Sequence, residues 1–226
     1  MQLIAHRGFG HRYPQNTVRA FESAAAVADG VEVDVRRSGS DDLVASHYGR
    51  LRLITDSGGR VADHSADELE SMSVEGSDWG IPRLERVFEV VPDDVTVELD
   101  LKEPGLADAA LDVAADADNE VVVTSFYSDA IWEARAADAD AALSYNFDVR
   151  LDRHLTTTEL IGCELANVHW SLCLATDIVS RAHERGLDVY AWPVGARPVA
   201  WAVRRRGVDG VVATNPGVCE WLEGRI

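Results

Sequence analysis

The sequence predicts a closed α/β barrel of the (β/α)8 TIM type, with a small insertion after the second strand. Short apolar runs alternate with helical segments about eight times along the 226 residues, as in parallel sheets with crossover helices. This length is slightly below the ~250 residues typical of such barrels. An open doubly wound sheet is less compatible, because no complete glycine-rich dinucleotide loop follows the first run. We expect residues 1–226 to form one domain.

Eight runs are expected to be strands, because each is short, rich in Val, Ile or Leu, and bounded by Gly, Pro, Asp or Asn. In chain order they are residues 2–6, 31–35, 95–101, 120–124, 142–145, 164–169, 188–192 and 210–214.

Helical patterns lie between these runs. The first helix begins at a capping residue, Asn16 or Thr17, and runs to residue 29. Pro198 suits the first turn of a later helix. The stretch from about 38 to 82 is too long for a single connection and is expected to form the insertion. The other expected helices are residues 84–91, 106–116, 128–137, 175–185, 198–206 and about 217–222.

The charge balance excludes two classes of partner. Thirty-nine acidic and 21 basic residues give a formal net charge of -18. Such a surface repels nucleic-acid backbones and anionic membranes, so we expect no nucleic-acid partner and no stable membrane insertion. We interpret the acidity as a halophilic adaptation to a very salty cytoplasm, where salt screens the self-repulsion.

Other features also favour a cytoplasmic location. The sequence shows no targeting segment and no apolar run of membrane-spanning length. Cys163, Cys173 and Cys219 fit neither a disulfide framework nor a zinc site, and are expected to be small buried side chains in a reducing compartment. The oligomeric state is not predicted.

Two predicted strands carry acidic residues between core residues. Because side chains alternate along a strand, Glu32 and Asp34 share one face, as do Glu98, Asp100 and Lys102. Buried carboxylates are costly unless they are paired or bound to metal. Oxygen donors without clustered Cys or His suit a hard cation, Mg²⁺ or Ca²⁺. The carboxyl ends of barrel strands are where active sites form, so we expect one here.

Three basic side chains are candidates for chemistry at the same end. Lys102 is the only lysine in the chain, and its compact charge could neutralise a phosphate. His6 closes the first predicted strand and His47 follows the second, so both could reach the same rim. Histidine is suited to general acid–base catalysis near neutral pH.

In order and spacing, these residues resemble the glycerophosphodiester phosphodiesterases. That family carries His-Arg-Gly, Pro-Glu-Asn-Thr, Glu-x-Asp-Val and His-Asp, and the chain has His6-Arg7-Gly8, Pro14-Gln15-Asn16-Thr17, Glu32-x-Asp34-Val35 and His47. Further matches are Ile81-Pro82-x-Leu84, Asp100-Leu101-Lys102, Ser125-Phe126, Trp192-x-Val194 and Gly207-Val208-Asp209-Gly210. Each match alone is weak, but the ordered set is specific and covers essentially the whole chain.

The resemblance implies a (β/α)8 barrel with a small insertion. It also implies metal-dependent hydrolysis of small-molecule glycerophosphodiesters to a glycerol phosphate and an alcohol, with one divalent cation, Mg²⁺ or Ca²⁺. Carried over by position, it implies an acid–base pair of His6 and His47, phosphate ligands Arg7 and Lys102, metal ligands Glu32, Asp34 and Asp100, and supporting roles for Asn16, Glu98 and Trp192.

The chain also departs from the family pattern. Gln15 replaces a glutamate and Tyr48 an aspartate, and we expect such changes to remove partners that tune the site. Asp100 replaces a glutamate, and its shorter side chain would need Glu98 or a water to complete a metal shell. Two alternatives stay open: a phospholipase-type lyase that forms a cyclic phosphate, and a non-catalytic phosphate-binding barrel.

Overall fold

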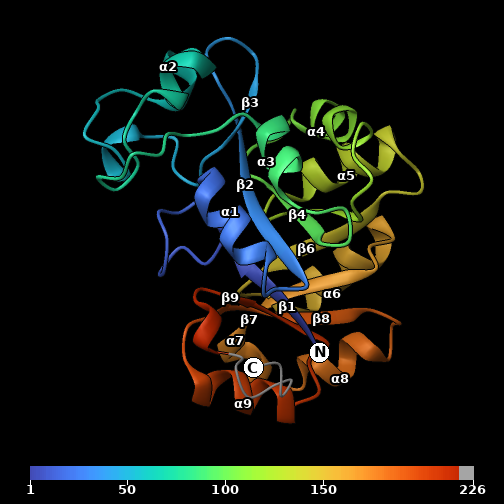
Figure 1. Cartoon of the computed structure of the whole chain (residues 1–226). Coiled ribbons are helices and arrows are strands. Elements are labelled where there is room, and N and C mark those ends of the chain that lie inside the picture. Colours follow the sequence, from blue (N-terminus) through green and yellow to red (C-terminus); the bar gives the residue numbers. More distant parts are fainter. Residues whose placement is uncertain (219–226) are drawn as a thin grey trace.

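The computed structural model describes residues 1–218, and its centre is a closed barrel of eight parallel strands (Figure 1). β1 pairs with both β2 and β9, which closes the barrel. This arrangement confirms the predicted fold, and each predicted strand overlaps an observed one. The barrel strands are β1 (Gln2–His6), β2 (Gly30–Arg37), β4 (Thr96–Leu101), β5 (Val121–Ser125), β6 (Ala142–Phe147), β7 (Leu165–His169), β8 (Asp188–Val194) and β9 (Gly210–Ala213).

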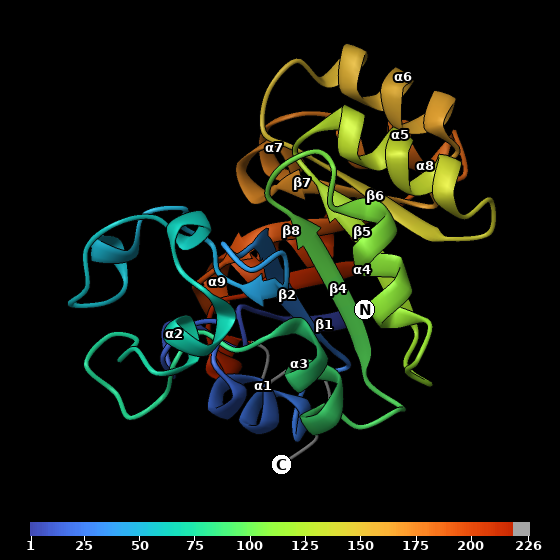
Figure 2. The same cartoon turned by 90° about the horizontal axis from the view of Figure 1, so that it is seen from above.

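Helices surround the barrel (Figure 2). They are α1 (Val18–Ala25), α3 (Leu84–Val90), α4 (Ala107–Ala114), α5 (Ser128–Ala137), α6 (Leu151–Ile161), α7 (Trp170–Ala175), α8 (Ile178–His183) and α9 (Arg197–Arg205). Among residues 1–218, no helix has both the length and the apolar character needed to cross a bilayer.

Three helix predictions need correction. The first helix ends at Ala25 rather than at residue 29, because the chain leaves it through a turn in which the backbone N–H of Val27 and of Ala28 both donate to Ala24. The helix expected over 175–185 is shorter and corresponds to α8 alone, and α6 and α7 were not predicted. The last expected helix, 217–222, overlaps a short 3-10 turn at Pro216–Val218, and its remainder lies outside the described residues.

The alternation along β2 and β4 explains their acidic residues. Val31 and Val33 on β2 and Leu99 on β4 are fully buried in the apolar core between barrel and helices. The residues between them point the other way, so Glu32 and Glu98 line a cavity inside the barrel. The two strands are therefore buried on both faces, one apolar and one polar.

The segment between β2 and α3 has its own small core. It contains β3 (Leu43–Ala45), which pairs antiparallel to the carboxyl end of β2, two 3-10 turns (Leu51–Leu53 and Val61–Asp63) and α2 (Ala66–Glu70). In Figure 1 this segment stands beyond the end of β2. Its buried apolar side chains form a cluster separate from the barrel core: Val44, Leu51, Ile54, Val61, Ala66, Leu69, Val74 and Ile81.

Cys163 and Cys173 are buried free thiols. Burial raises the pKa of each thiol to about 12, so neither is reactive at neutral pH. Cys219 lies outside the described residues.

Candidate active site

A cavity of about 260 Å³ opens at the carboxyl ends of the barrel strands. Eight of the ten predicted site residues line it. The other two, Asp34 and Asn16, bond to each other and to lining residues. The lining consists of His6, Arg7, Glu32, His47, Glu98, Asp100, Lys102, Thr124, Phe126, Asn146, Asn167, Trp192 and Val212.

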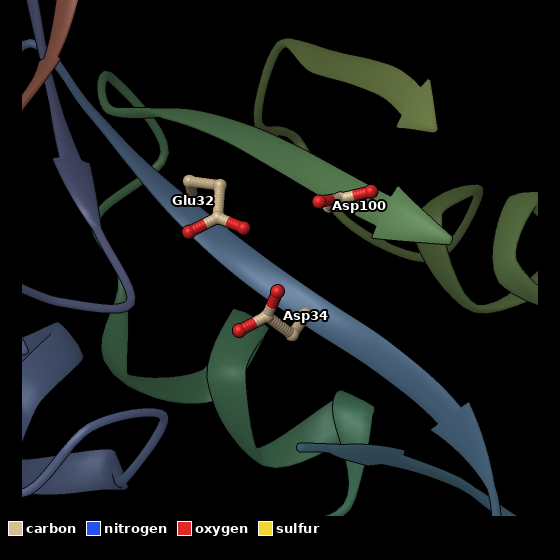
Figure 3. Close-up of side chains that lie close together, drawn as sticks. All are labelled: Glu32, Asp34 and Asp100. Atoms are coloured by element: carbon tan, nitrogen blue, oxygen red, sulfur yellow. The ribbon is translucent and has the colours of Figure 1, made fainter. Parts of the chain in front are cut away.

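Three buried carboxylates converge beside this cavity (Figure 3). Glu32, Asp34 and Asp100 each offer one oxygen, and these oxygens lie within 4.8 Å of one another. The register between β2 and β4 causes this, since Asp34 stands directly opposite Asp100. Among the described residues, Asp100 Oδ1 has no hydrogen-bond partner. Three oxygen donors, one of them an unpartnered buried oxygen, fit a hard divalent cation.

Both oxygens of Asp34 are held by protein partners. Oδ1 lies 3.0 Å from Nδ1 of His47 and 2.5 Å from Nζ of Lys102. Oδ2 accepts a hydrogen bond from the amide of Asn16 at 2.7 Å and lies 3.1 Å from Nε of Arg7. Burial alone would raise the pKa of Asp34, but Lys102, His47 and Arg7 outweigh it and hold the pKa well below its usual range. Asp34 therefore stays ionised.

The charges around Asp34 compensate one another only in part. Burial raises the pKa of Glu32 and of Asp100, and the negative charge of Asp34 raises both further. Burial disfavours the charge on Lys102, but its ion pairs with Asp100 and Asp34 outweigh this effect and raise its pKa. The two cations therefore do not fully offset burial and mutual repulsion of the three carboxyl groups, and a divalent cation bound there would favour the ionised forms of Glu32 and Asp100.

The two histidines have different surroundings. Burial, reinforced by the positive charge of Arg7, lowers the pKa of His6 to about 3, although Asp34 acts in the opposite direction. His6 is therefore neutral at physiological pH. His47 is fixed through its Nδ1 contact with Asp34, so Nε2 is the ring nitrogen that Asp34 does not engage. The ring of Tyr48 meets His47 edge-on, with 4.7 Å between ring centroids.

The loop after β1 explains the His-Arg-Gly sequence. Arg7, Gly8 and Phe9 all have positive φ, at 55°, 68° and 61°. A Cβ on Gly8 would lie 2.7 Å from the Cβ of Ala20 on α1, so only glycine fits this close approach. The strained turn directs the N–H of Arg7 to Oε2 of Glu32 at 2.8 Å.

We expected the change to Gln15 to remove a partner that supports the site, but Gln15 itself contacts Arg7. Nη1 of Arg7 donates to Oε1 of Gln15 at 2.9 Å, and Nε2 of Gln15 donates to Oε1 of Glu75 at 2.6 Å. The amide therefore supports Arg7 and also connects it to the segment between β2 and α3.

Glu98 lies outside the group of three converging carboxylates, although it lines the cavity.

The sequence analysis did not single out Thr124, Asn146 and Asn167, which also line the cavity. They occupy inward positions on β5, β6 and β7. The available signal was the same as for the carboxylates, a polar residue inside an apolar run. Trp192, which was predicted, donates from Nε1 to the carbonyl of Asn167 at 3.0 Å and meets Phe126 edge-on with 5.0 Å between centroids.

The chain is similar to known proteins along nearly its whole length. Residues 6–218 match the glycerophosphoryl diester phosphodiesterase family. A glycerophosphodiester phosphodiesterase of Caldanaerobacter subterraneus subsp. tengcongensis is 26% identical over 233 residues, which cover 95% of this chain and 94% of that protein.

Solved structures of two phosphodiesterases are also similar. One, from Oleispira antarctica, was solved in complex with the product sn-glycerol-3-phosphate. It has a TM-score of 0.91 and 25% identity, and the match covers 99% of this chain and 97% of that one. Another, a glycerophosphodiester phosphodiesterase from Thermotoga maritima, has a TM-score of 0.86 and 24% identity, with 99% and 98% covered. Because the family match extends over nearly the whole chain, the chain belongs to the glycerophosphoryl diester phosphodiesterase family.

Proposed function

We propose that this enzyme hydrolyses glycerophosphodiesters to a glycerol phosphate and an alcohol, with Mg²⁺ or Ca²⁺ as its cation. The observation that supports this proposal most is the convergence of Glu32, Asp34 and Asp100 beside a cavity that is lined by two histidines. The names of the relatives agree, since one is a glycerophosphodiester phosphodiesterase and another was solved with glycerol phosphate bound.

Five residues bind the reacting groups in this proposal. Glu32, Asp34 and Asp100 would hold the divalent cation, which when bound supplies Lewis-acid charge to the phosphate oxygens. Arg7 and Lys102 neutralise the phosphate as negative charge develops in the transition state. Both cations are already paired with Asp34, so they are fixed before substrate arrives.

We assign proton transfer to His6 and His47. One activates the attacking hydroxyl, either water or the substrate's own glycerol hydroxyl, and the other protonates the departing alkoxide. Asp34 fixes the ring of His47 through its contact with Nδ1.

The test is an assay of several glycerophosphodiesters in molar KCl, with Mg²⁺, Ca²⁺ or a chelator. We expect release of glycerol phosphate that depends on the metal. Phosphorus NMR of the products distinguishes hydrolysis from formation of a cyclic phosphate, which would indicate a lyase. Tight binding of metal and glycerol phosphate without turnover of any diester would instead indicate a non-catalytic binding protein.

We also propose that the enzyme works in a cytoplasm of high salt. The formal net charge of -18 supports this, because dense like charge on a folded chain is tolerated best where salt screens it.

A further inference from the structure

His47 lies on irregular backbone. It follows the end of β3 by two residues and belongs to neither a helix nor a strand, so no ladder of regular hydrogen bonds fixes it. Its ring is held on one side, where Nδ1 contacts Asp34. A general acid or base must keep its ring within hydrogen-bonding distance of the reacting oxygen, so the backbone that carries such a ring must be fixed as well.

Arg36 on β2 supplies this second contact. Its guanidinium donates twice to the carbonyl of His47, from Nε at 3.1 Å and from Nη2 at 3.0 Å. The third nitrogen, Nη1, donates to Oε2 of Glu103 at 3.2 Å. Because a guanidinium holds its donors in a rigid planar fork, the contact with Glu103 fixes the orientation in which Arg36 meets His47.

Glu103 is itself fixed at the carboxyl ends of two barrel strands. It directly follows Lys102, and its Oε1 accepts a hydrogen bond from the backbone N–H of Arg37 on β2 at 3.4 Å. The backbone N–H of Lys102 donates to the carbonyl of Val35, also on β2, at 3.1 Å. The position of Glu103 is therefore set by the register between β2 and β4.

These contacts form a closed ring that begins and ends at His47. Nδ1 of His47 lies 3.0 Å from Oδ1 of Asp34, and the same oxygen lies 2.5 Å from Nζ of Lys102. Lys102 is joined by a peptide bond to Glu103, which accepts from Arg36. Arg36 then closes the ring at the carbonyl of His47. Both the side chain and the backbone of His47 are thus held relative to Lys102.

We propose that Arg36 and Glu103 are positioning residues for the reaction and that they act through His47. This inference rests on the proposed function, in which His47 transfers a proton. Of these three described residues, His47 lines the cavity and the other two do not. Arg36 therefore affects the rate by holding His47 in place and not by binding the substrate.

The test is a double-mutant cycle of Arg36→Ala and His47→Ala, assayed on diglycerol phosphate with Mg²⁺. Arg36→Ala alone lowers kcat by about 10- to 100-fold, because a catalytic group that loses its placement loses this much rate. KM changes by less than about twofold, since substrate binding does not involve Arg36. When His47→Ala is already present, adding Arg36→Ala does not lower kcat further, because the side chain that Arg36 positions is absent.

Arg135→Ala is the matched control. Like Arg36, Arg135 is partly buried, donates to backbone carbonyls and pairs with a glutamate, but it lies on α5 and outside the cavity lining. Its loss lowers stability and leaves kcat unchanged. Arg36→Lys keeps the charge without the planar fork, so it recovers only part of the rate that Arg36→Ala loses.

Two results overturn the inference while the proposed function stands. One is a full rate in Arg36→Ala. The other is an equal loss of kcat with and without His47→Ala, because Arg36 would then act by a route other than His47. If Arg36→Ala does not fold, the same cycle with Glu103→Ala decides, and there we expect a loss of about 3- to 10-fold, since this ion pair is partly exposed to solvent. A wild-type enzyme that cleaves no glycerophosphodiester overturns the proposed function itself.

Discussion

At Asn16, a single amide organises the carboxylate at the centre of the site. Its Nδ2 donates to Oδ2 of Asp34, and its Oδ1 accepts from the backbone N–H of Asp34 at 3.2 Å. Asn16 itself has a positive φ of 54°, a conformation that asparagine tolerates better than most residues. The resemblance implied a supporting role for Asn16, and these contacts give that role a physical basis.

Asn16→Ala tests this role. The substitution leaves the buried N–H of Asp34 unpaired, so we expect the free energy of unfolding to fall by about 1–3 kcal/mol. The affinity for the divalent cation falls by about 10- to 100-fold, because Asp34 loses its fixed orientation. Calorimetric titration with Mg²⁺ or Ca²⁺ measures the affinity. Asn119→Ala is the control, since Asn119 donates to the backbone carbonyls of Pro92 and Val95 and its loss changes stability without changing metal affinity.

The histidine assignment is tested by His6→Ala and His47→Ala. Loss of a general acid or base lowers kcat by about 10²- to 10⁴-fold. His183→Ala, which removes a partly exposed histidine paired with Asp209 away from the cavity, leaves kcat unchanged. If either site variant keeps the full rate, that histidine does not transfer a proton.

At the scale of elements, the barrel strands were the part of the fold that the sequence predicted best, since each predicted strand overlaps an observed one. In β2 and β4 the acids alternate with core residues, and this pattern alone indicated a polar cavity. Thr124, Asn146 and Asn167 were missed because they come from three different strands, and only the register between strands brings them together. Helix α6 was missed because it contains three consecutive threonines and begins after Arg150, a residue at φ 50°.

The loop between β1 and α1 gives a prediction at this scale. Gly8→Ala combines a left-handed backbone with overlap against Ala20, so we expect a loss of about 2–4 kcal/mol in urea unfolding. Gly162→Ala, also at positive φ but with nothing within 4 Å of its Cβ position, loses only about 1 kcal/mol. Adding Ala20→Gly to Gly8→Ala restores part of the difference. Equal losses for the two glycine variants would show that close packing is not the cause.

At the scale of the whole molecule, the negative charge predicts a strong dependence of stability on salt. We expect the midpoint of thermal unfolding to rise steadily as KCl increases from dilute buffer to molar concentration, because screening weakens repulsion among the excess acids. Sucrose, which stabilises by exclusion without screening, provides the comparison. A midpoint that is the same in dilute buffer and in molar KCl would contradict the halophilic interpretation.

The second apolar cluster, between β2 and α3, has a dynamic consequence. Its eight buried residues pack separately from the barrel core, so the two regions can open as separate cooperative units. In amide hydrogen exchange, we expect the N–H groups of residues 38–82 to exchange through local opening at lower free energy than those of β4 and β5. Uniform protection of both regions would show one unit instead. Because Glu75 in this segment holds Gln15, each such opening also frees Arg7 from its support while the barrel stays intact.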